Sequence, residues 1–290
     1  MIVVPGPASR NLGQKIAEIL DARIVSVNLK SFPDGEYCLR FEGDLKGEEV
    51  AVVQSTGPPQ DMNIMQLLLM LDTAKDLGAE KVTAVVPYLA FARQDKRFLP
   101  GETVSAETIM KLIEACGTYQ FITVNIHSKN TLKQLSIPSK NLSAISSLAE
   151  HFKNQGLDNA FSLSPDKGAV ELAEEADKVL GGGCGWLRKE RDRHTGEIQV
   201  EEKSLHVKGR DVVVFDDIIS SGGTIARAVK MLKTQGARRV YAACVHPLLI
   251  GEAKQKILQS GAEEIVGTDS IPSSVKTVSL APLIAEALAR

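Results

Sequence analysis

The feature that most constrains the fold lies at residues 212–224, where an apolar run is followed by two acidic residues and a glycine-rich turn. Four consecutive apolar residues, 212–215, are typical of a strand buried on both faces of a parallel sheet. Asp216 and Asp217 follow at the predicted carboxyl end of this strand, where open α/β sheets bind their ligands. Residues 225–233 have the apolar spacing of a helix, so the segment predicts a strand, a turn and a helix with a ligand site at the turn.

The turn at residues 220–224, here called the glycine turn, reads Ser-Ser-Gly-Gly-Thr. Glycines allow the main chain to approach an anion closely, and the first amides of the following helix can donate hydrogen bonds to it. The acidic pair repels a phosphate and needs hydroxyl groups or a metal ion. A phosphorylated sugar offers a phosphate to the turn and a diol to the carboxylates. The structural alternative is an ordinary strand–helix turn with acidic residues near the helix start.

The rest of the chain alternates short apolar runs with segments of helical spacing, which predicts parallel sheets in an α/β fold. The expected strands are residues 2–4, 24–27, 50–53, 82–86, 121–124, 160–163, 212–215, 240–245 and 264–266. The expected helices are residues 11–20, 63–77, 106–115, 143–155, 169–176, 225–235 and 251–260.

The two halves of the chain resemble each other. The first half contains residues 49–57, then a predicted helix, then residues 77–87. The second half repeats this order and spacing with the strand from residue 212, a predicted helix and residues 235–247. The earlier copy lacks the acidic pair and the glycine turn, which suggests that one half binds the sugar phosphate and the other half has another task. We expect a boundary between residues 1–142 and 143–290, and leave open a return of the last helix to the first half.

Composition excludes several classes of protein. Among 290 residues, 34 Lys and Arg stand against 36 Asp and Glu, and the net charge of −2 argues against general nucleic-acid binding. No apolar stretch approaches the roughly 20 residues that span a bilayer, and the first residues do not form a signal peptide. The four cysteines have neither metal nor redox spacing and are expected to be reduced core residues. We therefore expect a cytoplasmic protein.

The segment from residue 212 to the glycine turn resembles the phosphoribosyl-diphosphate binding motif of type I phosphoribosyltransferases and ribose-phosphate diphosphokinases. In that family the acidic pair is followed by two apolar residues and Asp-Thr-Gly-Gly-Thr. Here Ser220 and Ser221 replace the Asp-Thr, and the hydroxyl of Ser221 retains a phosphate donor. This motif alone does not separate the two classes of enzyme.

Four further motifs separate them. In chain order they are residues 31–36, 88–97, 125–128 and 163–168, and all lie in register with a single family. Over essentially its full length the chain resembles ribose-phosphate diphosphokinase, most closely the short archaeal form. The resemblance implies an α/β fold with two similar type I phosphoribosyltransferase-like domains, each a mainly parallel sheet flanked by helices. It also implies transfer of the diphosphoryl group of ATP to the 1-hydroxyl of ribose 5-phosphate, with Mg²⁺ as cofactor.

The resemblance assigns roles to residues of both halves, and Lys189 and Arg191 match its catalytic cations. The expected metal site uses His127 and Asp166, although Asn125 stands where the family commonly has Asp and Lys167 where it often has His. The ATP-binding residues are expected to be Phe32, Asp34, Gly35, Glu36, Arg93, Gln94, Asp95 and His127. The ribose-5-phosphate residues are Arg191, Asp216, Asp217, Ser220, Ser221, Gly222, Gly223 and Thr224, and the diphosphate loop is Asp166, Lys167 and Gly168.

Each of these segments also has a purely structural interpretation. Residues 33–35 suit a surface β-turn, residues 93–97 a solvated charge run, and residues 164–168 a helix-capping turn. His127 could be a structural hydrogen-bonding residue, and the charged region after Arg188 could be a solvated hairpin that turns at residues 195–196.

Three other classes of protein remain as alternatives. A phosphoribosyltransferase does not explain the second half of the chain, and a catalytically silent regulatory partner does not explain why Lys189 and Arg191 are both present. A plain nucleotide-binding module leaves the sugar-phosphate motif without a use. The family resemblance further implies a homo-oligomer, a dimer at least, in which the turn at Phe32 completes the nucleotide site of a neighbouring subunit.

Overall fold

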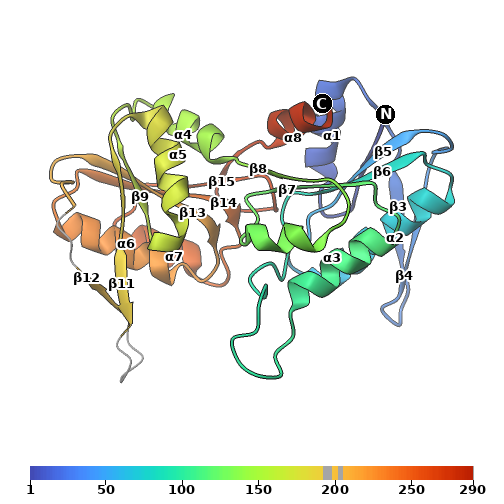
Figure 1. Ribbon diagram of the computed structural model, residues 1–290. Coiled ribbons are helices and arrows are strands. Elements are labelled where there is room, and N and C mark those ends of the chain that lie inside the picture. Colours follow the sequence, from blue (N-terminus) through green and yellow to red (C-terminus); the bar gives the residue numbers. More distant parts are fainter. Residues whose placement is uncertain (192–197, 202–204, 290) are drawn as a thin grey trace. The chain divides into compact units, whose positions relative to one another are not determined.

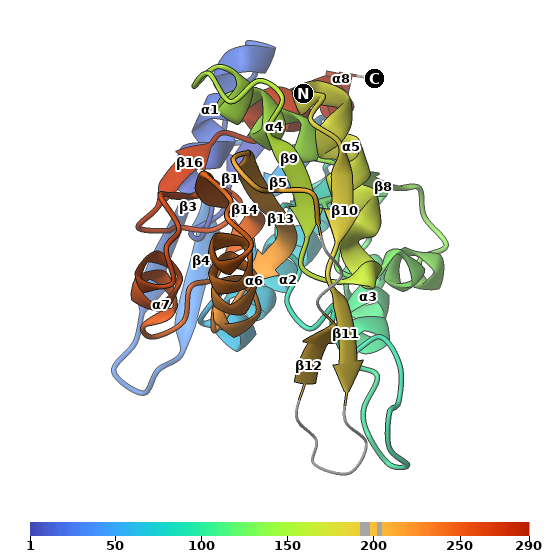
Figure 2. The ribbon, with the colours of Figure 1, turned by 90° about the vertical axis from the view of Figure 1, so that its left-hand side faces the viewer.

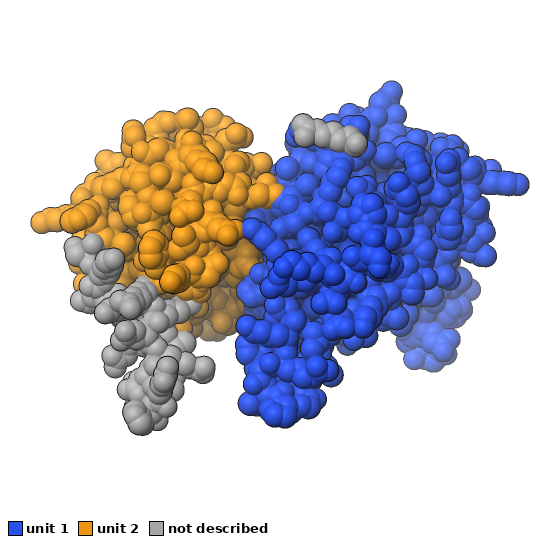
Figure 3. Space-filling view, in the orientation of Figure 1, with its two compact units in different colours: residues 1–142, 270–272, 279–290 blue, residues 143–269, 273–278 orange. Residues whose placement is uncertain are grey.

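The computed structural model describes residues 1–191, 198–201 and 205–289, with only the backbone described for 188–191 and 198–201. The chain divides into two compact units, shown in different colours in Figure 3. Unit 1 comprises residues 1–142, 270–272 and 279–290, and unit 2 comprises residues 143–269 and 273–278.

Unit 1 contains a six-stranded parallel sheet within the described residues, with the strand order β2-β1-β5-β6-β7-β8. Its strands are β1 (Ile2–Pro5), β2 (Arg23–Ile24), β5 (Glu49–Val53), β6 (Lys81–Val86), β7 (Gln120–Val124) and β8 (Ser139–Leu142). Its helices are α1 (Arg10–Leu20), α2 (Gln60–Asp76), α3 (Ser105–Ala115), the 3₁₀ helix η1 (Lys129–Gln134) and α8 (Ala281–Ala289).

Unit 2 repeats this plan with a parallel sheet of order β10-β9-β13-β14-β15-β16. Its strands are β9 (Phe161–Ser164), β10 (Cys184–Trp186), β13 (Asp211–Ile219), β14 (Arg239–Pro247), β15 (Ile265–Thr268) and β16 (Lys276–Val278). Its helices are α4 (Ile145–Lys153), the 3₁₀ helix η2 (Lys167–Ala169), α5 (Val170–Leu180), α6 (Gly223–Thr234) and α7 (Ala253–Gln259).

Each sheet is covered by a pair of helices on either face (Figure 1). In unit 1, α1 packs with α8 on one face and α2 lies with α3 on the other. In unit 2 the corresponding pairs are α5 with α4, and α6 with α7. The helix that follows the last strand of each sheet belongs to the other unit, because α4 follows β8 and α8 follows β16.

A two-stranded antiparallel hairpin is inserted at the same place in both units, between the second and third strands in chain order. In unit 1 it is formed by β3 (Val27–Ser31) and β4 (Tyr37–Phe41). In unit 2 it is formed by β11 (Arg188–Arg191) and β12 (Ile198–Glu201), which extend from the rest of the unit in Figure 2. The repeated order of strands, helices and hairpin supports the internal similarity that the sequence indicates.

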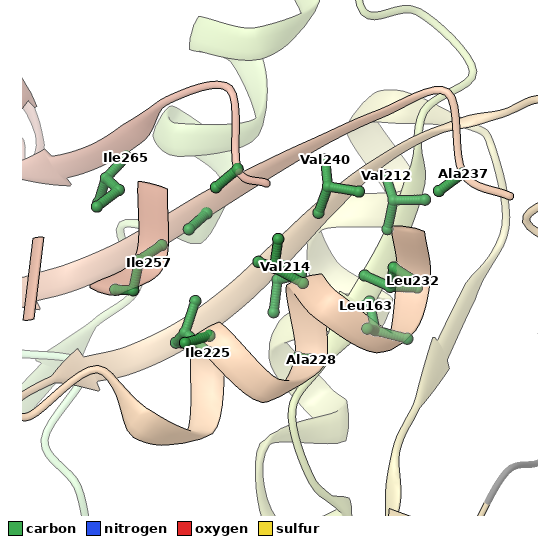
Figure 4. Close-up of a cluster of buried hydrophobic side chains, with 14 of the residues drawn as sticks. Leu163, Val212, Val214, Ile225, Ala228, Leu232, Ala237, Val240, Ile257 and Ile265 are labelled. Atoms are coloured by element: carbon green, nitrogen blue, oxygen red, sulfur yellow. The ribbon is translucent and has the colours of Figure 1, made fainter. Parts of the chain in front are cut away.

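The core of unit 2 shows why the apolar runs form central strands. Val212 and Val214 of β13 are fully buried, and they pack with Val240 from the neighbouring strand β14 (Figure 4). Ile225 and Leu232 of α6 lie on the same cluster, so the helical spacing that follows the glycine turn directs an apolar face onto the sheet.

Several element boundaries differ from the expectation. The strand expected at 212–215 continues to Ile219, because residues 216–219 still pair with β14. The strand expected at 24–27 is divided between β2 and the start of the β3–β4 hairpin. Short strands such as β4, β8, β10 and β16 were not anticipated, since three to five residues carry little periodicity.

The cysteines are all free, as expected, but the expectation that they are core residues was wrong for two of them. Cys38 and Cys184 are exposed, Cys116 is half-buried, and only Cys244 is buried. Cys38 and Cys184 lie in a hairpin and in an edge strand, which have an open face. Across the described part of the chain, no helix is both long and apolar enough to cross a bilayer.

Candidate functional site

The acidic pair lies near the carboxyl end of β13, where this strand pairs with only one neighbouring strand. Strand β9 pairs with residues 212–214 of β13 and with none of those beyond, whereas β14 pairs through Ile219. Asp216 and Asp217 are both half-buried at this one-sided edge. The main-chain amide of Asp217 donates to Oδ1 of Asp216 at 3.0 Å, and the amide of Ile218 donates to Oδ1 of Asp217 at 2.7 Å.

The environment of this pair disfavours two negative charges. Burial raises the pKa of Asp216 well above its ordinary value, and the charges of Asp217 and Asp166 raise the pKa further. Since Asp166 follows β9 and the pair belongs to β13, three carboxylates come together at one edge of the sheet of unit 2. Such a cluster is suited to binding hydroxyl groups or a cation, either of which relieves the repulsion.

The glycine turn connects this edge to α6. Gly222 is the N-cap of α6 with φ of +71°, a left-handed conformation that glycine adopts without the penalty of a Cβ atom. The N-cap Gly222 has no side chain to cap the first turn of α6, so the first amides of this helix can donate to a ligand. Ser220, Gly223 and Thr224 are half-exposed and Ser221 is exposed. The structure therefore brings the acidic pair and the glycine turn together, as the sequence predicts.

The diphosphate loop, residues 166–168, follows β9 on the same edge. Asp166 is the N-cap of η2, and its Oδ1 accepts a hydrogen bond of 2.9 Å from the amide of Gly168. The hydroxyl of Ser164 donates to the carbonyl oxygen of Asp166 at 2.7 Å, which fixes the start of the loop. Lys167 and Gly168 are exposed. The capping interaction considered for this loop is therefore present, and the amide of Gly168 already has an acceptor.

In unit 1, Arg93, Gln94 and Asp95 lie in the loop after β6. Arg93 and Gln94 are exposed, and Asp95 is half-exposed. Gln94 is tied to the start of α3, because its Oε1 accepts from the hydroxyl of Ser105 at 2.6 Å and its carbonyl oxygen accepts from the amide of Ala106 at 3.3 Å. The loop is thus anchored at its centre, with the Arg93 side chain directed to solvent.

His127 lies after β7, the strand adjacent to β6, so the loop of Arg93 and the loop of His127 share one edge of the sheet of unit 1. Asn125 starts the loop in a left-handed conformation with φ of +38°, and the amide of Ile126 donates to Oδ1 of Asn141 at 3.0 Å. The His127 side chain is exposed at the end of this turn.

The turn at Phe32 occupies the tip of the β3–β4 hairpin. The amide of Phe32 donates to the carbonyl oxygen of Glu36 at 2.8 Å, Oδ1 of Asp34 accepts from the amide of Glu36 at 3.1 Å, and Gly35 has φ of +94°. The Phe32 ring is 39% exposed, with Nζ of Lys30 lying 5.2 Å from its centroid. Figures 1 and 2 show this tip and the loop after β6 on separate parts of unit 1, so the structure does not bring together these two groups of expected ATP-binding residues.

Lys189 and Arg191 lie in β11, opposite Val200 and Ile198 of β12. This pairing is the hairpin that was considered as the structural alternative for the charged region. The side chains of both cations and the turn expected at residues 195–196 lie outside the described residues.

No group of three or more histidine, cysteine or acidic residues with metal-binding geometry is present in the described parts of the chain. Ser105 was not among the expected site residues, and Ser164 was expected only as part of the motif at residues 163–168; the structure shows that they hold Gln94 and Asp166 in place. Ser164 immediately precedes the loop at the end of a strand, a position that could have indicated its role, whereas Ser105 is 11 residues from Gln94 and had no such signal.

Comparison with known proteins agrees with this architecture. Residues 1–117 match the N-terminal domain of ribose phosphate pyrophosphokinase, and residues 132–277 match the phosphoribosyl transferase domain. Two such domains, with an acidic strand end and a glycine turn in the second, define a protein of the phosphoribosyltransferase fold class. The expected α/β fold with two similar domains is thereby confirmed.

Curated relatives identify the family more closely. Ribose-phosphate pyrophosphokinases of Methanobrevibacter smithii and Methanothermobacter thermautotrophicus are 42% and 40% identical, with 99% of each chain covered in both comparisons. The crystal structure of phosphoribosylpyrophosphate synthetase from Mycobacterium smegmatis matches with a TM-score of 0.89 at 29% identity, over 100% of this chain and 97% of that one. The chain belongs to the ribose-phosphate pyrophosphokinase family, another name for the diphosphokinases that the five motifs resemble, and the likeness to the archaeal branch is confirmed.

Proposed function

We propose that this protein transfers the β,γ-diphosphoryl group of ATP to the 1-hydroxyl of ribose 5-phosphate, giving 5-phosphoribosyl 1-diphosphate and AMP for nucleotide biosynthesis. The observation that carries the proposal is the acidic end of β13 joined to the uncapped start of α6 by the glycine turn. Relatives that match the chain from end to end are named ribose-phosphate pyrophosphokinases, which supports this choice among phosphoribosyl-binding functions.

Unit 2 binds the sugar phosphate in this proposal. The amides of Gly223 and Thr224 and the hydroxyl groups of Ser220, Ser221 and Thr224 donate to the 5-phosphate, while Gly222 keeps the turn close to it. Asp216 and Asp217 accept hydrogen bonds from the ribose hydroxyl groups. This orientation directs the 1-hydroxyl toward the diphosphate loop.

Unit 1 binds ATP. Arg93 pairs with phosphate oxygens through its planar guanidinium group, and the anchor at Ser105 holds Gln94 and the neighbouring Asp95 in position for the nucleotide. His127, on the adjacent loop, lies at the same edge of the sheet. Positioning and charge stabilisation account for catalysis, because phosphoryl-type transfer needs little covalent participation by the protein.

The chemistry of the carboxylates fits Mg²⁺, which prefers oxygen ligands. Burial is the main cause of the raised pKa of Asp216, and the charges of Asp217 and Asp166 raise it further; a divalent cation would neutralise these neighbouring negative charges. Mg²⁺ commonly retains waters and uses only one or two protein carboxylates together with substrate phosphates, so a protein cage of three ligands is not needed. We propose Asp166 and His127 as the residues that would hold the ion, which would supply charge neutralisation of the diphosphate oxygens.

Lys189 and Arg191 are the proposed catalytic cations, and Arg191 also contacts ribose 5-phosphate. They lie two residues apart in β11 of an inserted hairpin outside the main sheet. Such a hairpin can approach the bound substrates last and stabilise charge that develops in the transition state.

The adenine pocket is completed, in this proposal, by a second copy of the chain in a homodimer. Phe32 offers an aromatic face and Asp34 and Glu36 offer acceptors, yet the tip that carries them stands apart from the loop of Arg93. An apolar stripe of exposed side chains on α2, consisting of Met62, Met65 and Leu69, supports self-association of unit 1. The free cysteines and the use of ATP favour the cytoplasm as the compartment.

The direct experiment incubates the purified protein with Mg²⁺, ATP and ribose 5-phosphate and measures nucleotide and sugar products by mass spectrometry. Equal amounts of AMP and 5-phosphoribosyl 1-diphosphate support the proposal. ADP with a singly phosphorylated sugar product would show an ordinary kinase, and sugar-phosphate binding without turnover would indicate a regulatory relative.

A further inference from the structure

The glycine turn lacks a positive charge of its own. Its residues are two serines, two glycines and a threonine, and the ionisable side chains nearest along β13 and β9 are Asp216, Asp217 and Asp166. A phosphate dianion at the turn therefore lies close to a group of carboxylates that share its sign. Unit charges 4 Å apart interact by about 1 kcal/mol even in bulk water, and by about 4 kcal/mol near a protein surface. A cation from outside the turn would offset this repulsion.

Helix α7 and the loop before it are packed directly on the turn. The amide of Leu249 donates to the carbonyl oxygen of Ile219 at 2.9 Å, and the amide of Ile250 donates to that of Ser220 at 3.0 Å. A Cβ atom placed on Gly222 would lie 3.0 Å from the carbonyl oxygen of Ala253. The same atom would lie 3.1 Å from Cδ1 of Ile257, so one face of α7 forms a wall of the turn.

Lys256 lies beside the face of α7 that meets the turn, because it is three residues after Ala253. A Cβ atom placed on Gly223 would lie 3.4 Å from Nζ of Lys256. The side chain is otherwise exposed, and its ammonium group has no hydrogen-bond or ion-pair partner among the described residues. Its charge is therefore free to serve a ligand at the start of α6.

A second cation approaches the same residue from α6 itself. Nε of Arg227 donates to the carbonyl oxygen of Gly223 at 3.2 Å, which draws the guanidinium group back toward the helix start. Arg227 already has this main-chain acceptor, whereas Lys256 has all three of its ammonium donors available. Lys256 is accordingly the better candidate for direct contact with an anion.

We propose that Lys256 binds the 5-phosphate of ribose 5-phosphate and makes the site selective for a phosphorylated sugar. The inference rests on the proposed function, in which the glycine turn holds this phosphate. The phosphate is remote from the 1-hydroxyl that reacts, so Lys256 contributes to substrate binding in the ground state and the transition state alike. Its loss raises KM for ribose 5-phosphate and leaves kcat nearly unchanged.

The test compares Lys256→Met, which keeps the aliphatic stem without the charge, with Lys256→Arg, which keeps a cation. Lys230→Ala removes an exposed lysine of α6 and serves as the matched control. In Lys256→Met we expect KM for ribose 5-phosphate to rise about tenfold, the loss that corresponds to about 1.4 kcal/mol, with KM for ATP, kcat and Tm close to wild type. Lys256→Arg should recover most of the affinity, and Lys230→Ala should match the wild type.

Direct binding separates this inference from the proposed function. Calorimetric titration of wild type and Lys256→Met with ribose 5-phosphate, and then with inorganic phosphate, reports on Lys256 even in a protein that makes no phosphoribosyl diphosphate. Weaker binding of both ligands in Lys256→Met supports the phosphate contact. Unchanged binding and KM, or an equal loss for ATP, would overturn it and leave Lys256 a solvated surface residue.

Discussion

The amide of Asp217 donates a 3.0 Å hydrogen bond to Oδ1 of Asp216, so adjacent carboxylates of one strand share a half-buried edge. This hydrogen bond favours the ionised form of Asp216, but burial and the charges of Asp217 and Asp166 outweigh it and raise its pKa. The acidic pair is therefore electrostatically unfavourable, and bound hydroxyl groups or a cation would relieve the repulsion. Binding groups of this kind commonly reduce the stability of the protein that carries them.

The first prediction concerns Asp216→Asn, which should abolish activity and raise Tm at neutral pH. A carboxyl whose pKa is raised on folding contributes stability below its ordinary pKa, and this contribution is lost as pH rises through the folded value. The variant no longer ionises, so its Tm should fall less than that of the wild type between pH 5 and pH 8. Each kcal/mol gained in the free energy of unfolding should raise Tm by roughly 2–4 °C in a chain of this size.

Calorimetry of both proteins across this pH range measures the effect, with the exposed Asp158→Asn as control. Parallel curves of Tm against pH for wild type and Asp216→Asn would show that ionisation of Asp216 does not destabilise the folded protein.

The second prediction is that Gly222→Ala weakens binding of ribose 5-phosphate and destabilises unit 2. The new Cβ would combine a left-handed φ of +71° with a 3.0 Å approach to the carbonyl oxygen of Ala253. Left-handed conformation alone costs about 1–2 kcal/mol for a residue with a side chain. Gly181→Ala is the matched control, because Gly181 has φ of +75° and open space around the added atom.

Urea unfolding and KM for ribose 5-phosphate should both change more in Gly222→Ala than in Gly181→Ala. Equal losses in the two variants would mean that backbone strain, and not the packing of the turn on α7, determines the effect.

The third prediction is that Lys189→Ala lowers kcat by about a hundredfold or more, with little change in ATP affinity or Tm. The removal of one preorganised charge contact in a closed site commonly costs roughly 3 kcal/mol of transition-state stabilisation. Steady-state kinetics and a thermal melt check this, beside the exposed Lys208→Ala as control. A kcat near that of wild type would remove Lys189 from the catalytic step.

The fourth prediction concerns the ion cluster at the start of β13. Asp211 is 7% exposed and receives Nε of Arg238 at 2.9 Å and Nη2 of Arg239 at 2.7 Å, and these partners hold its pKa far below the ordinary value. This stability is present above the ordinary pKa and is lost as pH falls through the folded value. We expect Asp211→Asn to reduce the free energy of unfolding by about 2 kcal/mol at pH 7 without changing KM.

Urea titration at pH 7 and at pH 2 measures this contribution. A difference between the two proteins that does not shrink at the lower pH would contradict the assignment.

The fifth prediction tests the shared nucleotide site. An inactive Phe32→Ala/Asp34→Ala chain mixed with an inactive Lys189→Ala chain should regain up to about a quarter of wild-type activity, since random pairing of a two-fold dimer restores one site in half of the dimers. Mass spectrometry of the mixture establishes that subunits have exchanged. Proven exchange without recovery would place the whole site within one chain.

The sequence predicts the central elements of each unit because long apolar runs and helical spacing report burial directly. Residues 212–215 correspond to the first half of β13 and residues 225–235 to α6, and the glycine turn between them follows from its composition. The extension of β13 to Ile219 did not follow, because pairing with β14 overrides the weak strand preference of Asp216 and Asp217.

Residues that meet through tertiary packing were the hardest to predict. Lys256 lies 33 positions after Gly223 in an ordinary amphipathic helix, and no local pattern links the two. The separation of the Phe32 tip from the loop of Arg93 is similarly a property of the fold, since both carry plausible nucleotide-binding residues in sequence.

The position of α8 affects the order in which the chain can mature during synthesis. This helix packs with α1, and Nζ of Lys140 donates to the carbonyl oxygen of Ala287 at 2.8 Å, so the first unit includes residues made after those of the second unit. The ribosome adds about 5–20 residues each second, so the sheet of unit 1 waits several seconds with α1 but without α8 on one of its faces. The second unit has all of its own segments earlier, by residue 278. During synthesis, unit 2 can therefore be completed before unit 1, although unit 1 begins first in the sequence. Removal of α8 would impair unit 1 and leave all segments of unit 2 present.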